Sequence, residues 1–157
     1  MEDKSIGRLV SILYRQSQVY INHALKDLNI SSSEYIFLMA LYTNEGCSQE
    51  KLSSLLHIDK AATARAIKSL EEKGLVLRVN DENDKRAYKV FVTENGQSCR
   101  GIIYATLKGW TNLLTDGMDE VTINIVFDAL QSMTEKLQNT DYTESSADSG
   151  GNAEENR

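Results

Sequence analysis

The chain has 157 residues, of which 25% are charged and 41% hydrophobic, and its formal net charge at pH 7 is −6. That length fits one compact domain with a hydrophobic core, and no apolar run approaches the roughly 18 residues that a membrane-spanning helix needs. The first residues, Met1-Glu2-Asp3-Lys4, show no secretory pattern, and two cysteines are too few for a disulfide framework, so we expect a cytoplasmic protein.

The first predicted element is a long helix between Ile6 and Leu28. Apolar residues recur there at helical spacing over about 23 residues, or roughly 35 Å at 1.5 Å per residue. Next, Ser31-Ser32-Ser33-Glu34 predicts a turn with a capping box, because the Glu34 carboxylate can reach back to the Ser31 amide. The residues from Tyr35 to Leu41 predict a largely buried helix.

A second strong helix is predicted between Asp59, which suits an N-cap, and Gly74, which suits the position after the helix end. At 100° per residue one face gathers core residues: Ala62, Thr63, Ala66, Ile67 and Leu70. The opposite face carries two small residues and three cations: Lys60, Ala61, Ala64, Arg65 and Lys68. Such a face can approach a DNA groove and offer donors to guanine and phosphate, although an ordinary solvated helix has a similar charge pattern.

A charged hairpin follows this helix. Leu75, Leu77 and Val79 alternate on its first strand, and Tyr88, Val90 and Val92 alternate on its second. The loop between them, residues 80–86, ends in Asp84-Lys85-Arg86. We expect Asp84 to pair with Arg86 and to direct the guanidinium toward a minor groove; the alternative is a solvated turn without a partner.

Two further helices are predicted near the C-terminus. Thr93 suits the cap of the first, whose stripe ends near Gly117, and the second begins at Asp119. Their apolar stripes comprise Ile103, Leu107, Trp110 and Leu114, and then Ile123, Val126, Phe127, Leu130, Met133 and Leu137. Together with the first helix they offer more apolar surface than a small winged domain covers, which favours dimerisation over closure of one monomeric core.

The order of these elements is that of a winged helix-turn-helix: mainly α, with a small β-hairpin wing, flanked by long dimerisation helices. Its charge distribution agrees modestly, because residues 47–100 contain ten Lys and Arg against eight Asp and Glu, whereas the remainder has seven against fifteen. Beyond Asn139 the chain is rich in Ser, Glu, Asp, Gly and Asn, so we expect residues 140–157 to form a disordered acidic tail.

The segment resembles the DNA-binding core of the MarR family of bacterial transcriptional regulators. The matching pieces are the helix with its Leu-Glu-Glu-Lys-Gly ending, Leu75-Val76, the Asp84-Lys85-Arg86 wing, and Val92-Thr93-Glu94-Asn95-Gly96. The resemblance implies a MarR-type domain over residues 1–139, with the winged core at 30–96 and dimerisation helices at 4–29 and 94–138. It also implies a homodimer on a pseudo-palindromic operator, with the recognition helix in the major groove and Arg86 in the minor groove.

The predicted function is therefore that of a DNA-binding transcriptional regulator, a repressor, whose partner is double-stranded DNA with an inverted repeat. The expected DNA-binding residues are Lys60, Ala61, Ala64, Arg65, Lys68, Asp84, Lys85 and Arg86. The alternative is a winged-helix protein-interaction module without DNA binding. An enzyme is not expected, because the sequence shows no nucleophile elbow or phosphate-binding loop, and His23 and His57 lack metal-ligand spacing; no cofactor or metal is predicted.

The resemblance finally implies an effector, because such regulators often bind small aromatic or phenolic compounds between the dimer helices and the winged domain. The compatible side chains are Tyr14, Tyr20, Tyr35, Phe37, Tyr42 and His57, although each of these residue types more often serves in a core or on a surface. Redox sensing through Cys47 or Cys99 stays open as an alternative form of control.

Overall fold

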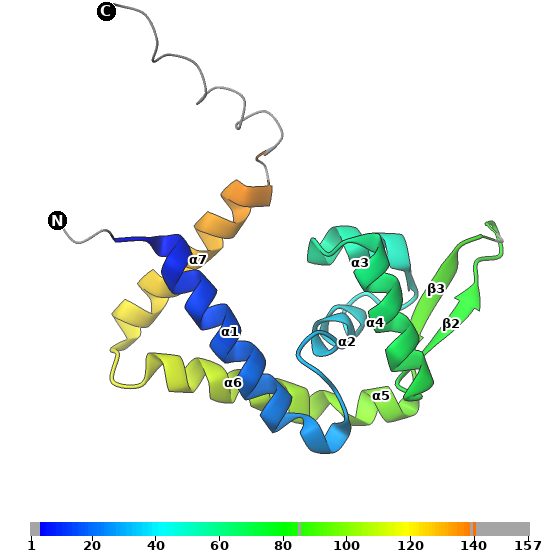
Figure 1. The fold of residues 1–157 in the computed structure, drawn as a ribbon, viewed down its shortest axis with the longest axis horizontal. Helices are drawn as coiled ribbons and strands as arrows, with labels where there is room; N and C mark the ends of the chain where they lie inside the picture. The colour runs from blue at the N-terminus through cyan, green and yellow to red at the C-terminus, as the bar shows by residue number, and fades with distance from the viewer. Residues whose placement is uncertain (1–3, 85, 139, 141–157) are drawn as a thin grey trace, which may run out of the picture. The chain divides into compact units, whose positions relative to one another are not determined.

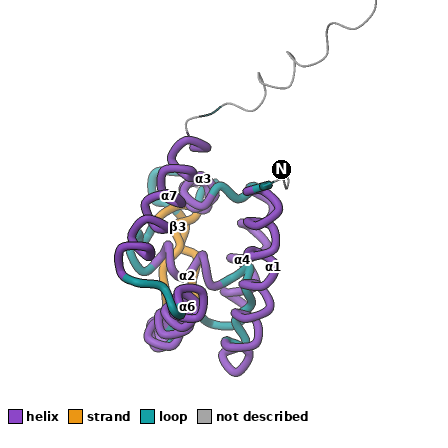
Figure 2. Tube along the Cα trace, turned by 90° about the vertical axis from the view of Figure 1, so that its left-hand side faces the viewer, coloured by secondary structure: helices purple, strands orange, loops and turns teal. Residues whose placement is uncertain are grey.

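The computed structural model describes residues 4–84, 86–138 and 140, and helices make up most of the trace (Figures 1 and 2). The described residues form two compact units that divide between Leu114 and Thr115. None of the described helices is long and apolar enough to span a membrane. The expected tail, residues 140–157, lies outside the described residues except for Thr140.

The first helix, α1, spans Ile6–Ala24 and is followed by a 3-10 turn, η1, at Lys26–Leu28. Ser5 caps α1, since its hydroxyl accepts from the Arg8 N–H at 3.2 Å. The prediction of one helix to Leu28 was therefore wrong by one turn. α1 itself ends at the Leu25 C-cap, and Asn29, in a left-handed conformation (φ 54°), ends η1.

Three shorter helices follow: α2 at Tyr35–Leu41, α3 at Gln49–Leu56 and α4 at Lys60–Glu72. The predicted capping box is confirmed, because the Ser31 N–H donates to the Glu34 carboxylate at 2.8 Å. The predicted ends of α4 are confirmed as well. The Asp59 carboxylate accepts from the Ala62 N–H at 2.8 Å, and Gly74 after the helix has φ +69°.

The sheet has three antiparallel strands in the order β1-β3-β2, with β1 at Cys47–Ser48, β2 at Val76–Asn80 and β3 at Tyr88–Val92. The register places Val76 opposite Val92 and Asn80 opposite Tyr88. The inward face of β2 differs from the predicted alternation, since Val76 is buried while Leu77 and Val79 are 40% and 45% exposed. Leu75, which precedes the strand and donates its N–H to the Leu70 carbonyl at 2.9 Å, is buried as well.

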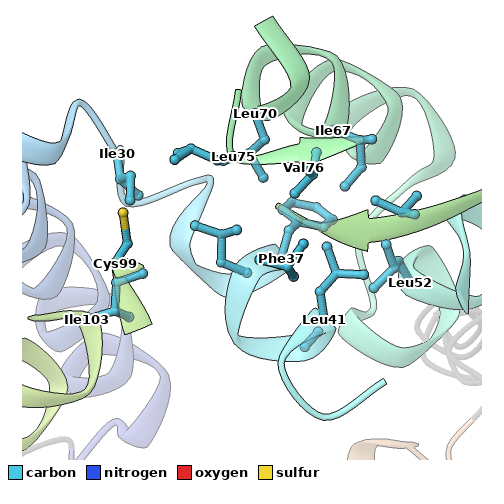
Figure 3. Close-up of a cluster of buried hydrophobic side chains, with 14 of the residues drawn as sticks. Ile30, Phe37, Leu41, Leu52, Ile67, Leu70, Leu75, Val76, Cys99 and Ile103 are labelled. Atoms are coloured by element: carbon cyan, nitrogen blue, oxygen red, sulfur yellow. The ribbon is translucent and has the colours of Figure 1, made fainter. Parts of the chain in front are cut away.

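The core of the first unit lies between α2, α3, α4 and the sheet. Figure 3 shows the Phe37 ring among side chains from these elements, including Leu41, Leu52 and Ile67. Leu52 and Ile67 are fully buried and Phe37 is 1% exposed. The winged part of the chain thus buries its own apolar face, where the start of β2 and the end of β3 pack into the core that also holds α4.

The helix predicted after Thr93 is divided into α5, Glu94–Ser98, and α6, Arg100–Thr115. Thr93 caps α5 as expected, accepting from the Gly96 N–H at 3.1 Å. The second unit contains α7, Glu120–Gln138, which Asp119 caps through the Thr122 N–H at 2.7 Å. The predicted stop is confirmed as well, because Gly117 has φ +77°.

Candidate nucleic-acid interface

A tight turn joins α3 to α4 and gives the pair its helix-turn-helix geometry. His57 closes α3 in a left-handed conformation (φ 52°), and the buried Ser53 hydroxyl donates to the Ile58 carbonyl at 2.5 Å. The Ile58 N–H in turn donates to the Ser53 carbonyl at 3.1 Å. These bonds satisfy the backbone of the turn and fix the direction in which α4 leaves it.

The outward face of α4 is the one predicted from helical spacing. Lys60, Ala61, Arg65 and Lys68 are exposed and Ala64 is partly exposed, whereas the opposite face is buried. Thr63, Ile67 and Leu70 have no exposed surface. The core therefore holds α4 by one side and leaves two small side chains and three cations facing solvent.

Two of these cations have weak ionic partners. Lys60 Nζ lies 2.8 Å from Glu50 of α3, with both side chains about three-quarters exposed, and Lys68 Nζ lies 3.8 Å from Glu72 one turn along α4. Exposed pairs of this kind contribute little to stability and exchange readily for another anion. Among the described residues, no carboxylate lies within ion-pair distance of Arg65.

The wing differs from the predicted arrangement. The Asp84 carboxylate accepts from the backbone N–H of Arg86 at 2.9 Å. The Arg86 guanidinium is in none of the ion pairs among the described residues. A carboxylate two residues before an amide forms this short-range turn more easily than it reaches a long side chain. Asp84 thus shapes the loop and leaves the exposed Arg86 guanidinium unpaired by it, while Lys85 lies outside the described residues.

The hairpin is joined to α4 by a contact that the sequence analysis missed. The Glu71 carboxylate accepts from Nε and Nη2 of Arg78 at 2.9 and 2.6 Å and from the Arg78 backbone N–H at 3.2 Å. The same guanidinium lies over the Tyr88 ring, 5.4 Å from its centroid. The hydrogen bonds from Arg78 lower the pKa of Glu71. The seven-residue spacing crosses from helix to strand, so no periodicity could have indicated it.

A cleft of about 750 Å³ lies beside α4 within the first unit. Three of the predicted effector residues, Tyr14, Tyr35 and Phe37, line it, and so do Arg65 and Ala62 of α4. Phe37 is 1% exposed, so it is mainly a core residue. The cleft therefore combines aromatic material with a cation that belongs to the outward face of α4.

The other three predicted effector residues lie elsewhere. Tyr20 packs against Trp110 with ring centroids 5.2 Å apart, and the Tyr42 hydroxyl donates to the Gly96 carbonyl at 2.8 Å. His57 is exposed and forms the C-cap of α3. Spacing along the chain could not separate these packing roles from a ligand site.

One wall of the cleft contains a buried carboxylate, Glu34. Its oxygens accept from Lys73 Nζ at 2.7 Å, from the Ser69 hydroxyl at 2.6 Å, and from both donors of Ser31 at 2.8 Å. Burial raises the pKa of Glu34, but these donors outweigh burial and lower the pKa to about 2. The contacts with Ser69 and Lys73 join the start of α2 to the end of α4, and the sequence pattern did not indicate them.

The two cysteines are buried and free. Burial raises the pKa of the Cys47 thiol, which disfavours the reactive thiolate. The Cys99 thiol contacts the Asn95 carbonyl at 3.4 Å. Neither environment supports an exposed oxidant sensor.

Comparison with known proteins agrees with this geometry. The sequence model of the MarR family matches residues 30–88, from just after η1 to the first residue of β3. A MarR transcriptional regulator from Methanosarcina mazei Go1 is 38% identical, with a TM-score of 0.81 over 83% of this chain and 94% of that one. The chain belongs to the MarR family. The family consists of transcriptional regulators rather than enzymes, so the predicted fold class and function class are confirmed.

Two other relatives extend the comparison. A Listeria monocytogenes regulator of the family, solved in complex with 26mer DNA, is 32% identical with a TM-score of 0.80, over 87% of this chain and 91% of that one. The HTH-type transcriptional regulator YybA of Bacillus subtilis (strain 168) is 36% identical over 92 residues, or 59% of this chain. The chain spans 61% of the length of YybA.

Proposed function

We propose that this MarR-family regulator is a homodimeric repressor that binds inverted-repeat operator DNA through α4 and the wing. The observation that carries the proposal is the outward face of α4, where Arg65 and Lys68 stand beside the small residues Ala61 and Ala64. Small side chains let the helix approach base edges, and an unpaired arginine is the usual partner of guanine. The Listeria relative, which was solved in complex with 26mer DNA, supports DNA binding by this chain.

The wing would contact a second groove of the DNA, next to the one that α4 enters. Arg86 is exposed near the end of the loop, and the Asp84 turn leaves its guanidinium available to phosphate or to a narrow minor groove. Lys60 and Lys85 would contribute contacts to phosphates. The overall charge of −6 does not oppose this arrangement, because it is the local field near the duplex that steers binding.

Dimerisation is supported by unpartnered apolar surface on the helices that flank the winged core. On α1, Ile6 and Leu9 are 58% and 62% exposed, and on α7, Val121 and Ile125 are 69% and 61% exposed. Considered separately, each helix carries seven large hydrophobic side chains that are more than a third exposed, which is typical of an interaction surface. We propose that residues 4–29 and 94–138 supply the interface of a two-fold dimer.

Selection of bound sequences from random duplex DNA tests the proposal. We expect an inverted repeat whose half-sites are about one helical turn apart, bound by a dimer with an affinity that falls steeply with salt. Binding of the same protein to unselected duplex DNA provides the non-specific baseline. Failure to enrich any sequence at low salt would favour the protein-interaction module instead.

We further propose that a small aromatic anion in the cleft beside α4 weakens operator binding. Tyr14 and Tyr35 offer aromatic contacts there, and Arg65 lines both the cleft and the proposed DNA face. A ligand that binds the DNA-free conformation tenfold better than the DNA-bound one shifts the equilibrium by about 1.4 kcal/mol. Calorimetric titration of aromatic carboxylates, with and without operator, would show binding that operator opposes; binding unaffected by operator would exclude this control.

A further inference from the structure

The contact between the recognition helix and the wing is built from three residues, Glu71, Arg78 and Tyr88, which we call the wing clamp. Glu71 lies in the last turn of α4, Arg78 in the middle of β2, and Tyr88 at the start of β3. Three hydrogen bonds join the first two side chains, at 2.6, 2.9 and 3.2 Å. Arg78 then stacks on Tyr88, so the clamp reaches from the helix across both strands of the hairpin.

The position of the clamp matters because, along β2, apolar burial stops before it, although Val90 opposite Arg78 on β3 is fully buried. Val76 is 2% exposed, but the next residues of β2 are not buried, and Leu77 and Val79 are 40% and 45% exposed. The strand order makes β2 an edge of the sheet, with β3 between it and β1. The outer half of β2 is therefore held by its pairing with β3 and by the polar contact to α4.

The chemistry of the clamp suits a rigid link. The planar guanidinium meets one carboxylate oxygen through two donors, and the other oxygen holds the strand backbone at the same residue. Forked arginine pairs fix direction as well as distance, and an aromatic face below the guanidinium further limits its rotation. The side chains are 34% and 29% exposed, so water screens the pair less than it screens Lys68 and Glu72, which are about two-thirds exposed.

We propose that Glu71, Arg78 and Tyr88 are positioning residues that hold the wing at a fixed angle to α4, so that Arg86 and Arg65 engage adjacent grooves together. The inference rests on the proposed DNA-binding function. Two contacts on one rigid body reinforce each other because the second binds at high effective concentration once the first has formed. If the link loosens, the wing contact becomes an independent and weaker event.

The quantity to measure is therefore the coupling between clamp and wing, that is, how much the loss of affinity caused by Arg86→Ala changes when the clamp is removed. Affinity alone does not test the proposal. Loss of the Glu71 carboxylate also removes a negative charge near phosphate, which by itself strengthens binding to any duplex. Glu72 offers a matched control, since it is the neighbouring acid on α4 and contacts Lys68 rather than the wing. Glu72→Ala changes the charge equally and leaves the clamp intact.

The experiment is a set of double-mutant cycles on the selected operator, measured by fluorescence anisotropy with the full chain. We expect Arg86→Ala to weaken binding about tenfold in the wild type but less than about threefold in the Glu71→Ala background. The loss from Arg65→Ala should be equal in both backgrounds. Glu72→Ala should change neither loss, and Glu71→Gln, which keeps the acceptor oxygen, should restore part of the coupling.

A second variant separates positioning from folding. Arg78→Lys keeps the cation but loses the forked contact, and it should reduce the Arg86 loss as Glu71→Ala does. Equal Arg86 losses in the wild type, Glu71→Ala and Arg78→Lys, with native circular dichroism, would overturn the positioning role while leaving the proposed function intact. Absence of operator binding by the wild type would overturn the proposed function and this inference with it.

Discussion

The winged core and α7 use apolar residues in opposite ways. In the core, the side chains of Phe37, Leu52 and Ile67 are at most 1% exposed, so this part of the chain supplies its own partners. In α7, Val121, Ile125 and Phe127 are more than half exposed, and none of the helix's described side chains is buried. The winged core is therefore stabilised by its own packing, whereas the apolar face of α7 is the surface that we propose a dimer partner covers.

The largest effect on stability is expected when packing is removed within the core. Leu52→Ala should lower the free energy of unfolding by about 2–5 kcal/mol, because it leaves a cavity where the side chain is fully buried. Leu55, on the same helix α3 but 47% exposed, provides the control, and Leu55→Ala should cost less than about 1 kcal/mol. Urea unfolding of both variants checks this, and equal costs would show that α3 packs differently.

A second prediction concerns the polar link inside the core, Glu34. Its pKa is lowered to about 2 in the folded chain from an ordinary value of 4.5. A lowered pKa means stability that is complete above pH 4.5 and lost as the pH falls toward 2, on the order of 3 kcal/mol in total. We expect Glu34→Gln to be less stable than the wild type at pH 6, and the gap to close progressively below pH 4.5.

Subtracting the free energy of unfolding of Glu34→Gln from that of the wild type at each pH isolates the contribution of Glu34, because the other acids titrate equally in both proteins. Glu82→Gln, which removes an exposed carboxylate of the wing loop, provides the control and should parallel the wild type. A gap between Glu34→Gln and the wild type that stays constant from pH 6 to pH 2 would contradict the lowered pKa.

These examples also show what the sequence alone could predict. The caps at Asp59 and Thr93 were predictable because a cap joins residues three apart, and the buried face of α4 was predictable because helical spacing is regular. The whole winged arrangement followed from the order of such local signals.

Contacts between elements were not predictable in the same way. Glu34 and Lys73 are 39 residues apart, and the link from Glu71 to Arg78 crosses a helix–strand turn. The alternation of Leu75, Leu77 and Val79 did not indicate which face of β2 is buried, because Val76 is buried while Leu77 and Val79 are exposed. Asp84 was expected to pair with a side chain, but the nearer backbone N–H competes better.

The third prediction tests what the stable core presents to DNA. Arg65→Ala should cost about 1–3 kcal/mol of binding free energy at the selected operator, without changing the free energy of unfolding, since the side chain is exposed. Lys108→Ala removes an exposed cation of α6 and should leave specific binding nearly unchanged. Anisotropy titrations at one salt concentration compare the two; equal losses would mean that Arg65 contributes only its charge.

The fourth prediction addresses α7. Phe127→Asp places a charge on a side chain that is 53% exposed in the single chain, so the free energy of folding should change little. If the exposed face of α7 is covered in a dimer, burying that charge should weaken the dimer at least tenfold, or about 1.4 kcal/mol. Sedimentation of this variant and of Ser132→Asp, a polar position on α7, gives the comparison.

An unchanged dimer in Phe127→Asp would mean that the dimer interface lies on another surface. A wild type that is monomeric at micromolar concentration would contradict the proposed dimer itself. A weakened dimer with native circular dichroism would confirm that the core and α7 differ in where their partners come from. The same outcome would predict weaker operator binding at low protein concentration, because two half-sites would no longer be joined.

The smallest effect is expected from residues 140–157, which extend the comparison to a third kind of sequence. From Asp141 to Arg157 the chain has five acids against one arginine and almost no large apolar side chains, so it has little to bury against either unit. Deletion after Asn139 should change the free energy of unfolding by about 0.5 kcal/mol or less and leave the dimer intact. Because the deletion also removes net negative charge, affinity for any duplex should rise slightly at low salt and converge with that of the full chain at high salt. Thermal unfolding, sedimentation and anisotropy at two salt concentrations measure these three quantities, and a marked loss of stability or of dimer would show that the tail packs against the folded part.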